Sequence, residues 1–295
     1  MRFDRLHAIG LLAGLLPSTA QAGWFIDGSA GIDYDDNLPR AQDDADIEGG
    51  GFLSFSAAPG FYWQATGRTA VIVSGDFSAA QYPEYDGLGN FTYGATTAVR
   101  TKFGLGPHAP WARAALSAGR HDFNHALRDG WHWSASLAAG MRLGTRWNVQ
   151  AAWRYESRRS DEVQDIPFLV DTFGIGGDAW DIDAHNLSLD AVFDINERLA
   201  AVLGYTRRMG ETTATTRIGP AVFDASDAIA PDVVFGADRF AYRVDADTNI
   251  FAAGLSLAIG DHASLNAGYE YQDSNAAQGF KYANHIAHFN ALFSW

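Results

Sequence analysis

The clearest pattern in this chain is an alternation of apolar residues with polar or small ones. Between residues 131 and 143, large apolar side chains and alanines take the odd positions, while polar and small residues take most even positions. The same period of two recurs at 147–155, 187–195, 251–258 and 265–271. Successive side chains of a β-strand point to opposite faces, so the pattern predicts strands with one apolar and one polar face.

The length of these segments favours a membrane over a soluble β-sandwich. Soluble strands average about five or six residues, whereas a tilted transmembrane strand needs about ten. Aromatic residues also gather near the segment ends, as in the two aromatic girdles that flank the apolar band of a transmembrane barrel. These aromatics are Trp24, Trp63, Phe91, Tyr93, Phe103, Trp111, Trp131, Trp133, Trp147, Tyr155, Tyr205, Tyr271 and Trp295.

Short and long connections alternate along the chain, which is also typical of transmembrane β-barrels. The short ones lie at 66–68, 104–110, 144–146, 196–198 and 260–262, and the long ones near 35–48, 83–90, 124–129, 158–184, 210–248 and 273–280. We therefore predict an all-β fold, a closed antiparallel transmembrane β-barrel of twelve strands. The strands are expected at 24–34, 50–65, 69–82, 91–103, 111–123, 131–143, 147–157, 186–195, 199–209, 249–259, 263–272 and 282–295.

Two places leave the strand prediction open. Segment 210–248 has room for an extra hairpin, for example Thr212–Phe223 against Val233–Val244, so ten or fourteen strands are alternatives. Pro59 lies inside the second predicted strand, where it removes one ladder donor. We expect a bulge or kink at Pro59-Gly60.

The amino-acid composition excludes several other classes of protein. Only 19% of the 295 residues are charged, against about 25% in soluble proteins. Beyond the N-terminus no run of 18 apolar residues occurs, so helical membrane spans are not expected. The absence of cysteine excludes disulfides and thiolate chemistry. A net charge of −14 argues against a nucleic-acid partner.

The N-terminus reads as a secretory signal peptide, residues 1–22. A short positive start precedes an apolar run at 8–16, and Ala20-Gln21-Ala22 provides a small-x-small cleavage site. We expect cleavage near Ala22, a single barrel domain over 23–295, and location in a bacterial outer membrane with the N-terminus in the periplasm.

Polar residues on the predicted inner faces are candidates for lining the barrel interior. They are Arg142, Asn148, Gln150, Arg154, Asp190, Asp194, Glu270, Asn284, His288 and Asn290. Both charge signs occur, so two interpretations stay open: paired charges that brace the barrel, or a hydrated pore with weak ion preference.

Three long loops are acidic, and two of them also carry apolar stretches. The acidic loops are 35–48, 158–184 and 210–248. Their acidic residues lack EF-hand spacing, so no metal ligands are assigned, and two interpretations stay open: a solvated anionic surface or divalent-cation binding. The apolar stretches predict loops that pack on each other or fold into the mouth as a constriction or lid. The constriction candidates are Phe168, Leu169, Phe173, Phe223 and Phe235.

The sequence predicts no catalytic residues and no cofactor. No Gly-x-Ser-x-Gly elbow and no His-Glu-x-x-His helix is present. His121 and Asp122 are neighbours on one predicted strand, so they point to opposite faces and do not form a pair. We expect a protein without enzymatic activity.

Both ends of the predicted barrel resemble known outer-membrane proteins. The segment 287–295 alternates and ends on Trp295, and it resembles the C-terminal strand of Gram-negative outer-membrane β-barrel proteins. That resemblance implies recognition by the barrel assembly machinery. The segment Gly31-Ile32-Asp33-Tyr34-Asp35-Asp36-Asn37 is similar to the Gly-Tyr-Asp-Ser-Asn opening strand of surface-lipoprotein-assembly-modifier-type barrels. The helical repeats that those proteins carry in the periplasm are not seen in this sequence.

We expect a porin-like channel for passive passage of small polar solutes, with outer-membrane lipid as its surroundings. The alternative is a barrel closed by its own loops that acts as a surface scaffold, adhesin or export partner.

Overall fold

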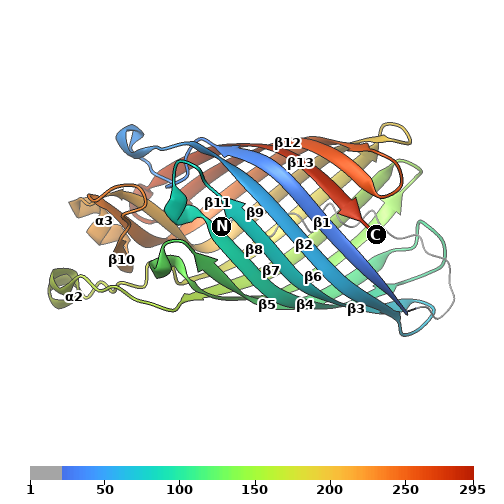
Figure 1. The fold of residues 1–295 in the computed structure, drawn as a ribbon, viewed down its shortest axis with the longest axis horizontal. Helices are drawn as coiled ribbons and strands as arrows, with labels where there is room; N and C mark the ends of the chain where they lie inside the picture. Colours follow the sequence, from blue (N-terminus) through green and yellow to red (C-terminus); the bar gives the residue numbers. More distant parts are fainter. Residues whose placement is uncertain (1–21) are drawn as a thin grey trace.

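A computed structural model describes residues 22–295, which form one sheet closed on itself (Figure 1). Apart from Ala22, the expected signal peptide lies outside these residues. Twelve strands build the wall: β1 (Ala22–Asp35), β2 (Gly50–Gln64), β3 (Thr69–Gln81), β4 (Asn90–Lys102), β5 (Trp111–Phe123), β6 (Gly130–Leu143), β7 (Trp147–Ser160), β8 (Ile182–Asp194), β9 (Leu199–Arg217), β11 (Arg239–Ala258), β12 (Ala263–Ala276) and β13 (Lys281–Ser294).

Every wall strand pairs antiparallel with two neighbours. The ring closes where the last strand, β13, pairs with the first, β1, while β9 pairs directly with β11 past the short β10. The predicted twelve-stranded closed barrel is therefore confirmed. A thirteenth strand, β10 (Ala228–Pro231), pairs with the far part of β11, has one bridge to Gly176, and adds no strand to the wall.

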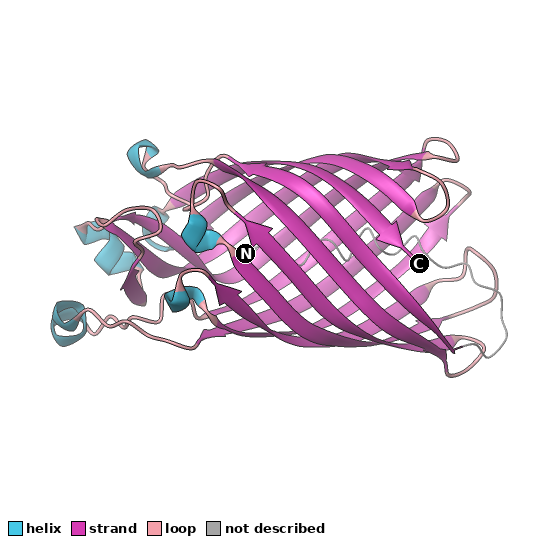
Figure 2. Ribbon diagram, viewed as in Figure 1, coloured by secondary structure: helices cyan, strands magenta, loops and turns pink. Residues whose placement is uncertain are grey.

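The two ends of the barrel differ. At the short-turn end the strands are joined by the turns 65–68, 103–110, 144–146, 195–198 and 259–262. At the long-loop end lie α2 (Pro167–Phe173), α3 (Pro220–Ala225) and the 3-10 turns η2 (Asp44–Asp46), η3 (Asp86–Leu88), η4 (Ala126–Arg128) and η5 (Ala277–Gly279) (Figure 2). None of the helices in residues 22–295 is long and apolar enough to cross a membrane.

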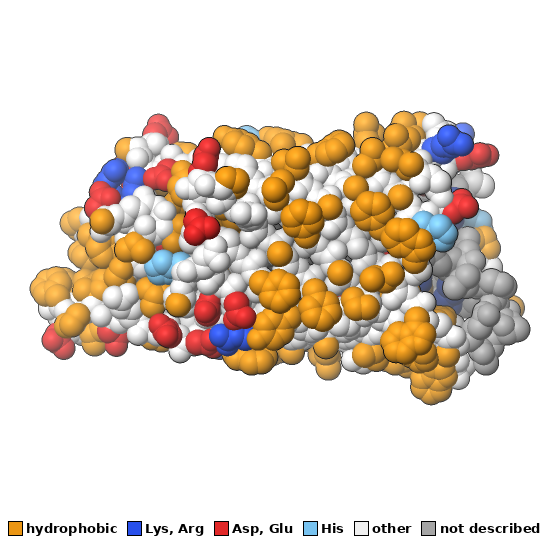
Figure 3. Space-filling view, in the orientation of Figure 1, with side chains coloured by type: hydrophobic (Ala, Val, Ile, Leu, Met, Phe, Trp, Pro, Cys, Tyr) orange, Lys and Arg blue, Asp and Glu red, His pale blue; other side chains and the backbone are white. Residues whose placement is uncertain are grey.

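The outside of the wall is apolar. Leu116 on β5, Leu137 on β6 and Phe289 on β13 each expose more than half of their surface outward. Figure 3 shows apolar side chains spread over the visible wall, while charged side chains gather toward its two ends. Because side chains alternate along a strand, the residues between these apolar positions face the interior.

Strands β9 and β11 extend far past their predicted ends. Their ladder continues without a break to the pair Arg217–Arg239, so the region predicted as a loop with an optional extra hairpin is a prolongation of two wall strands. Threonines fill much of this part of β9, and β-branched residues favour strands even where the apolar alternation fades.

The expected bulge at Pro59 is absent. Between β2 and β3 the pairs Ala57–Phe77 and Gly60–Ser74 share one register, and only Ala58 and Pro59 lack partners on that side. No residue is inserted, so the register does not shift. The missing proline N–H leaves a gap of two residues in this ladder.

Gly60 is required by a side chain on the neighbouring strand. Phe25 is its cross-strand partner on β1, and a Cβ built at Gly60 would lie 2.2 Å from the Phe25 ring. Gly268 on β12 also faces the interior, but a Cβ there would meet its nearest atom at 3.5 Å, an ordinary contact.

We expect Gly60→Ala to destabilise the barrel by about 1–3 kcal/mol, because the Phe25 ring would have to leave its place in the packed wall. Gly268→Ala, the matched control, should change stability by less than about 0.5 kcal/mol. Urea unfolding of the refolded protein in lipid vesicles measures both. Equal effects of the two substitutions would contradict this role of Gly60.

Candidate functional site

The register places all ten predicted lining residues on the interior face. They alternate with the exposed apolar residues of their strands, and their cross-strand pairs agree from strand to strand. These ten are Arg142, Asn148, Gln150, Arg154, Asp190, Asp194, Glu270, Asn284, His288 and Asn290.

Several interior charges are paired from one strand to another. Arg142 on β6 lies 2.8 Å from Asp194 on β8 at the short-turn end, and Arg208 on β9 lies 3.2 Å from Glu156 on β7 nearer the long-loop end, so each pair reaches across the strand between. Gln150 on β7 donates to Asp190 on the neighbouring β8 over 3.1 Å. Such contacts neutralise charge on the wall and connect two or three strands, which fits a braced interior.

A second polar network joins β1, β2 and β13, with a further interior bond on β12 beside it. The imidazole Nδ1 of His288 lies 2.6 Å from Asp33, which also accepts a hydrogen bond from Ser54 over 2.9 Å. Asn284 donates to the Asp35 carboxylate over 3.0 Å. On β12 itself, Gln272 donates to Glu270 over 2.6 Å.

Three further side chains lie on the interior face, where the sequence prediction did not place them, and for Trp111 the prediction was wrong. Trp111 was predicted in an aromatic girdle, yet it faces the interior: its ring lies 4.8 Å from the Arg100 guanidinium and beside Gly140. Arg113 is the direct cross-strand partner of Arg100. The alternation within β4 and β5 was the available signal for both arginines.

The long-loop end is covered by a structure that we call the cap, residues 161–181 and 210–245. It contains α2, α3, β10 and the extended part of the β9–β11 ladder. The Phe235 ring, between β10 and β11, lies 5.3 Å from the Tyr85 ring in the β3–β4 loop. In the ring of twelve strands, β3 and β4 stand opposite β9 and β11. The cap therefore crosses the mouth of the barrel.

Further contacts join the cap to the other loops around the mouth. Thr215 donates its backbone N–H to the carbonyl of Pro39 in the β1–β2 loop over 2.8 Å. Arg128 in η4 lies 2.6 Å from the fully buried Asp232 of the cap. The ring of Phe280, after η5, lies 5.9 Å from that of Tyr242.

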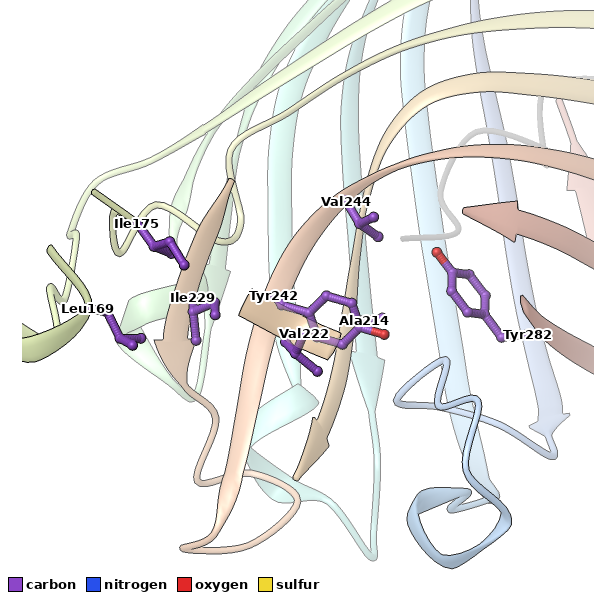
Figure 4. Packing of buried hydrophobic residues seen from close by; sticks show 8 residues of the cluster. All are labelled: Leu169, Ile175, Ala214, Val222, Ile229, Tyr242, Val244 and Tyr282. Carbon is purple, nitrogen blue, oxygen red and sulfur yellow. The ribbon is translucent and has the colours of Figure 1, made fainter. Parts of the chain in front are cut away.

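The cap has an apolar core of its own. Figure 4 shows its side chains between the β9–β11 ladder, β10 and the loop that follows β7. The buried members are Leu169, Ile175, Ala214, Val222, Ile229, Tyr242, Val244 and Tyr282. Of these, Tyr282 belongs to the interior face of β13, so the core reaches down to the mouth.

The five predicted constriction residues belong to the cap. Leu169 is buried in its core, and Phe173 stacks on Phe223 at 5.3 Å with an interplanar angle of 8°. Phe168 packs edge-on against Phe173 and remains largely exposed. Phe235 contacts Tyr85, as described above. The two loops thus pack on each other.

An ionic cluster around Asp46 fastens the cap to the β1–β2 loop. The Asp46 carboxylate accepts a hydrogen bond from Thr216 over 2.5 Å and forms ion pairs with Arg217 and Arg239. Arg239 also lies 3.2 Å from Glu48. Asp46 and Arg239 are both almost fully buried.

The pKa of Asp46 reflects this setting. Burial raises it, but hydrogen bonds from Thr216 and the Arg217 backbone, together with the charge of Arg239, outweigh burial and bring the pKa below its ordinary value. Nearby, burial and the carboxylate of Glu48 raise the pKa of the Tyr85 phenol to about 12. At neutral pH Asp46 is therefore charged and Tyr85 is neutral.

No family model matches the chain, and no curated protein matches it. Among solved structures, an outer membrane channel from Pseudomonas putida F1 superposes with a TM-score of 0.51 at 11% identity, covering 96% of this chain and 100% of that one. The chain has the fold of an outer-membrane β-barrel. The β-domain of the Bordetella autotransporter BrkA gives a TM-score of 0.45 at 15% identity (94% and 100% covered), and the outer membrane channel DcaP of Acinetobacter baumannii gives 0.41 at 9% (95% and 99%).

Within the part of the chain that the structure describes, no group of three or more His, Asp or Glu side chains is arranged to hold a metal ion. His121 and Asp122 point to opposite faces, as expected: His121 bonds Thr92 inside the barrel, while Asp122 pairs with Arg120 outside. The barrel thus has a polar interior in which several charges are paired, and a cap that crosses its mouth at the long-loop end.

We expect Asp46→Asn to loosen the cap while leaving the barrel wall intact. The substitution leaves the buried Arg239 without its closest charge partner, so opening the cap should become easier by about 2–3 kcal/mol. Hydrogen exchange of residues 210–245 measures this effect. Asp261→Asn, in an exposed turn at the opposite end, is the control; an equal effect from it would contradict the assignment.

Acid should loosen the same contact. Because the pKa of folded Asp46 is depressed, its stabilisation is complete above pH ~4 and is lost as pH falls through the folded value. Limited pepsin digestion below about pH 4 should cleave the wild-type cap progressively faster as pH drops. Asp46→Asn should lack this component, and identical pH profiles of the two proteins would refute it.

Proposed function

We propose that this protein is a porin-like channel through which small polar solutes diffuse passively, with the cap as its gate. The observation that carries the proposal is a closed barrel whose outside is apolar and whose interior wall is polar. An apolar outer face is stable only against lipid, and a polar inner face only against water or paired charge. The diffusing solute requires no covalent chemistry and no cofactor.

We place the barrel in the outer membrane with its short-turn end in the periplasm, after removal of residues 1–22. Short turns on the periplasmic side and long loops on the cell surface are typical of such barrels. Trp295 ends the chain with its indole largely exposed at the short-turn end. Its backbone exchanges two hydrogen bonds with Ile26, of 2.9 and 3.0 Å. This exposed aromatic end is what the assembly machinery would recognise.

The cap supports a gated channel over a permanently open one. Its core reaches Tyr282 on the interior face, and Phe235 touches the opposite wall of the mouth. A solute entering from the long-loop end must pass this structure. The same closure is the observation in favour of the alternative, a loop-closed barrel acting as a surface scaffold, adhesin or export partner.

A disulfide across the mouth tests the gate directly, because the chain has no cysteine of its own. A Cβ built at Gly87, in η3, lies 2.6 Å from Cγ2 of Val234 in the cap, so cysteines at the two positions fall within the reach of a disulfide. We expect oxidised Gly87→Cys/Val234→Cys to lose most single-channel conductance in planar bilayers, and a reductant to restore it.

The two single-cysteine variants are the controls, and their conductance should match wild type with or without reductant. Openings that persist unchanged in the oxidised double variant would show that the cap is no gate. If neither the wild type nor Asp46→Asn conducts at any voltage, the channel proposal fails and the loop-closed barrel takes its place.

A further inference from the structure

Three cationic side chains lie together on the interior face at the short-turn end. Arg100 and Lys102 are on β4, and Arg113 is on β5. Arg100 and Arg113 are direct cross-strand partners, and Lys102 is paired with Trp111 in the next interior row. We call Arg100, Lys102 and Arg113 the basic cluster.

The basic cluster differs from the paired arginines elsewhere in the barrel. Arg142 and Arg208 each have a carboxylate partner. By contrast, no carboxylate of residues 22–295 lies within 4.0 Å of a nitrogen of Arg100, Lys102 or Arg113. The Nε atoms of Arg100 and Arg113 are buried without a hydrogen-bond partner in residues 22–295, a feature that the ion-paired Arg128 and Arg243 share, so the missing carboxylate is what distinguishes the basic cluster.

One interior carboxylate, that of Asp76 on β3, acts on the basic cluster from a distance. It accepts hydrogen bonds from Ser74 over 3.1 Å and from Thr96 over 2.5 Å, so its oxygens are held by hydroxyl groups of β3 and β4 and form no ion pair with the guanidinium groups. Its single negative charge interacts with Arg113 but cannot balance three cations. The basic cluster therefore keeps a net positive charge.

The surroundings hold the guanidinium groups in place. The Trp111 ring lies 4.8 Å from Arg100 Cζ, close enough for a cation–π interaction. Trp111 in turn packs over Gly140, where a Cβ would lie 2.7 Å from its ring. On their other sides, Arg100 pairs with Ala70 on β3 and Arg113 pairs with Ala138 on β6. These small side chains leave space beside the two guanidinium groups.

Like charges directly opposite each other on neighbouring strands destabilise a sheet, so this arrangement needs a compensating role. The planar fork of an arginine matches two oxygens of a carboxylate or phosphate, and two forks side by side strengthen that match. We propose that Arg100, Arg113 and Lys102, with Trp111 as a positioning residue, bind the oxyanion group of a small solute inside the barrel.

This inference rests on the proposed function, because the solute reaches the basic cluster through the barrel. Its test does not require conduction. Protein purified from membranes into detergent is titrated calorimetrically with inorganic phosphate and, separately, with acetate, at fixed ionic strength in a buffer without either anion. We expect saturable binding of at least one anion, and the tighter of the two identifies the class of solute.

Matched variants make the titration specific. Arg100→Gln and Arg113→Gln should each weaken binding at least tenfold, whereas Arg100→Lys should weaken it less, because it keeps the charge and loses the fork. Arg142→Gln removes one interior cation at the same end of the barrel and should leave the affinity within about twofold of wild type. Trp111→Leu should weaken binding without removing a charge.

The unfolding temperature of each variant shows whether a loss of anion binding comes from misfolding. Removing one of two opposed like charges should not lower the unfolding temperature, so loss of binding by a variant that melts like wild type supports the site. Equal affinities in Arg113→Gln and Arg142→Gln, or no saturable binding of either anion to wild type, would overturn the inference. Conduction without anion binding refutes this site alone, while binding without conduction refutes the channel and leaves the site standing.

Discussion

The structure depends on one constraint, that every backbone N–H and C=O within lipid must find a partner in the protein. A sheet meets it only when its first and last strands pair with each other, as β1 and β13 do here. Closure then divides every strand into an outward and an inward face. The exposed apolar wall and the ion-paired interior both follow from that division, and even the gap at Pro59 is tolerated because the β1 side of the ladder remains complete.

Beyond the lipid, backbone groups can bond to water, and there the extended β9–β11 ladder forms the base of the cap. The β9–β11 ladder continues to Arg217 and Arg239, where water can solvate edges. There β10 covers the edge of β11 that β12 no longer reaches. The prolonged ribbon brings Ile229 and Tyr242 against Leu169 from the preceding loop. A continuous ladder thus gives the cap a fixed base on the wall, which an irregular loop of the same length would lack.

Much of this fold can be predicted from the sequence, because alternation and connection length are local signals. The twelve wall strands and the interior positions of residues such as Arg142 and Asp190 follow from a period of two. Trp111 could not be placed in the same way, since an aromatic at a strand end satisfies the girdle pattern whichever face it occupies. The partner of Arg208 is set by the lateral register of the strands, and the partners of Asp46 are set by contacts between loops at the mouth. Both sets of partners are distant in sequence, so the alternation pattern does not predict them.

The cap is held by contacts of two unequal kinds, and this inequality determines where the mouth would open. Its own segments share an apolar core, in which each fully buried large side chain contributes about 1.5–3 kcal/mol. Its links to the other loops are polar or single contacts: the Tyr85–Phe235 ring contact, the buried Asp46–Arg239 pair and the Arg128–Asp232 pair. The half-exposed Arg217 adds only about 0–1 kcal/mol to the Asp46 cluster, so the boundary between the cap and the β1–β2 loop depends chiefly on the charge of the buried Asp46. Loss of that charge would free the cap from this loop, and the cap would then move as one body on the β9–β11 base.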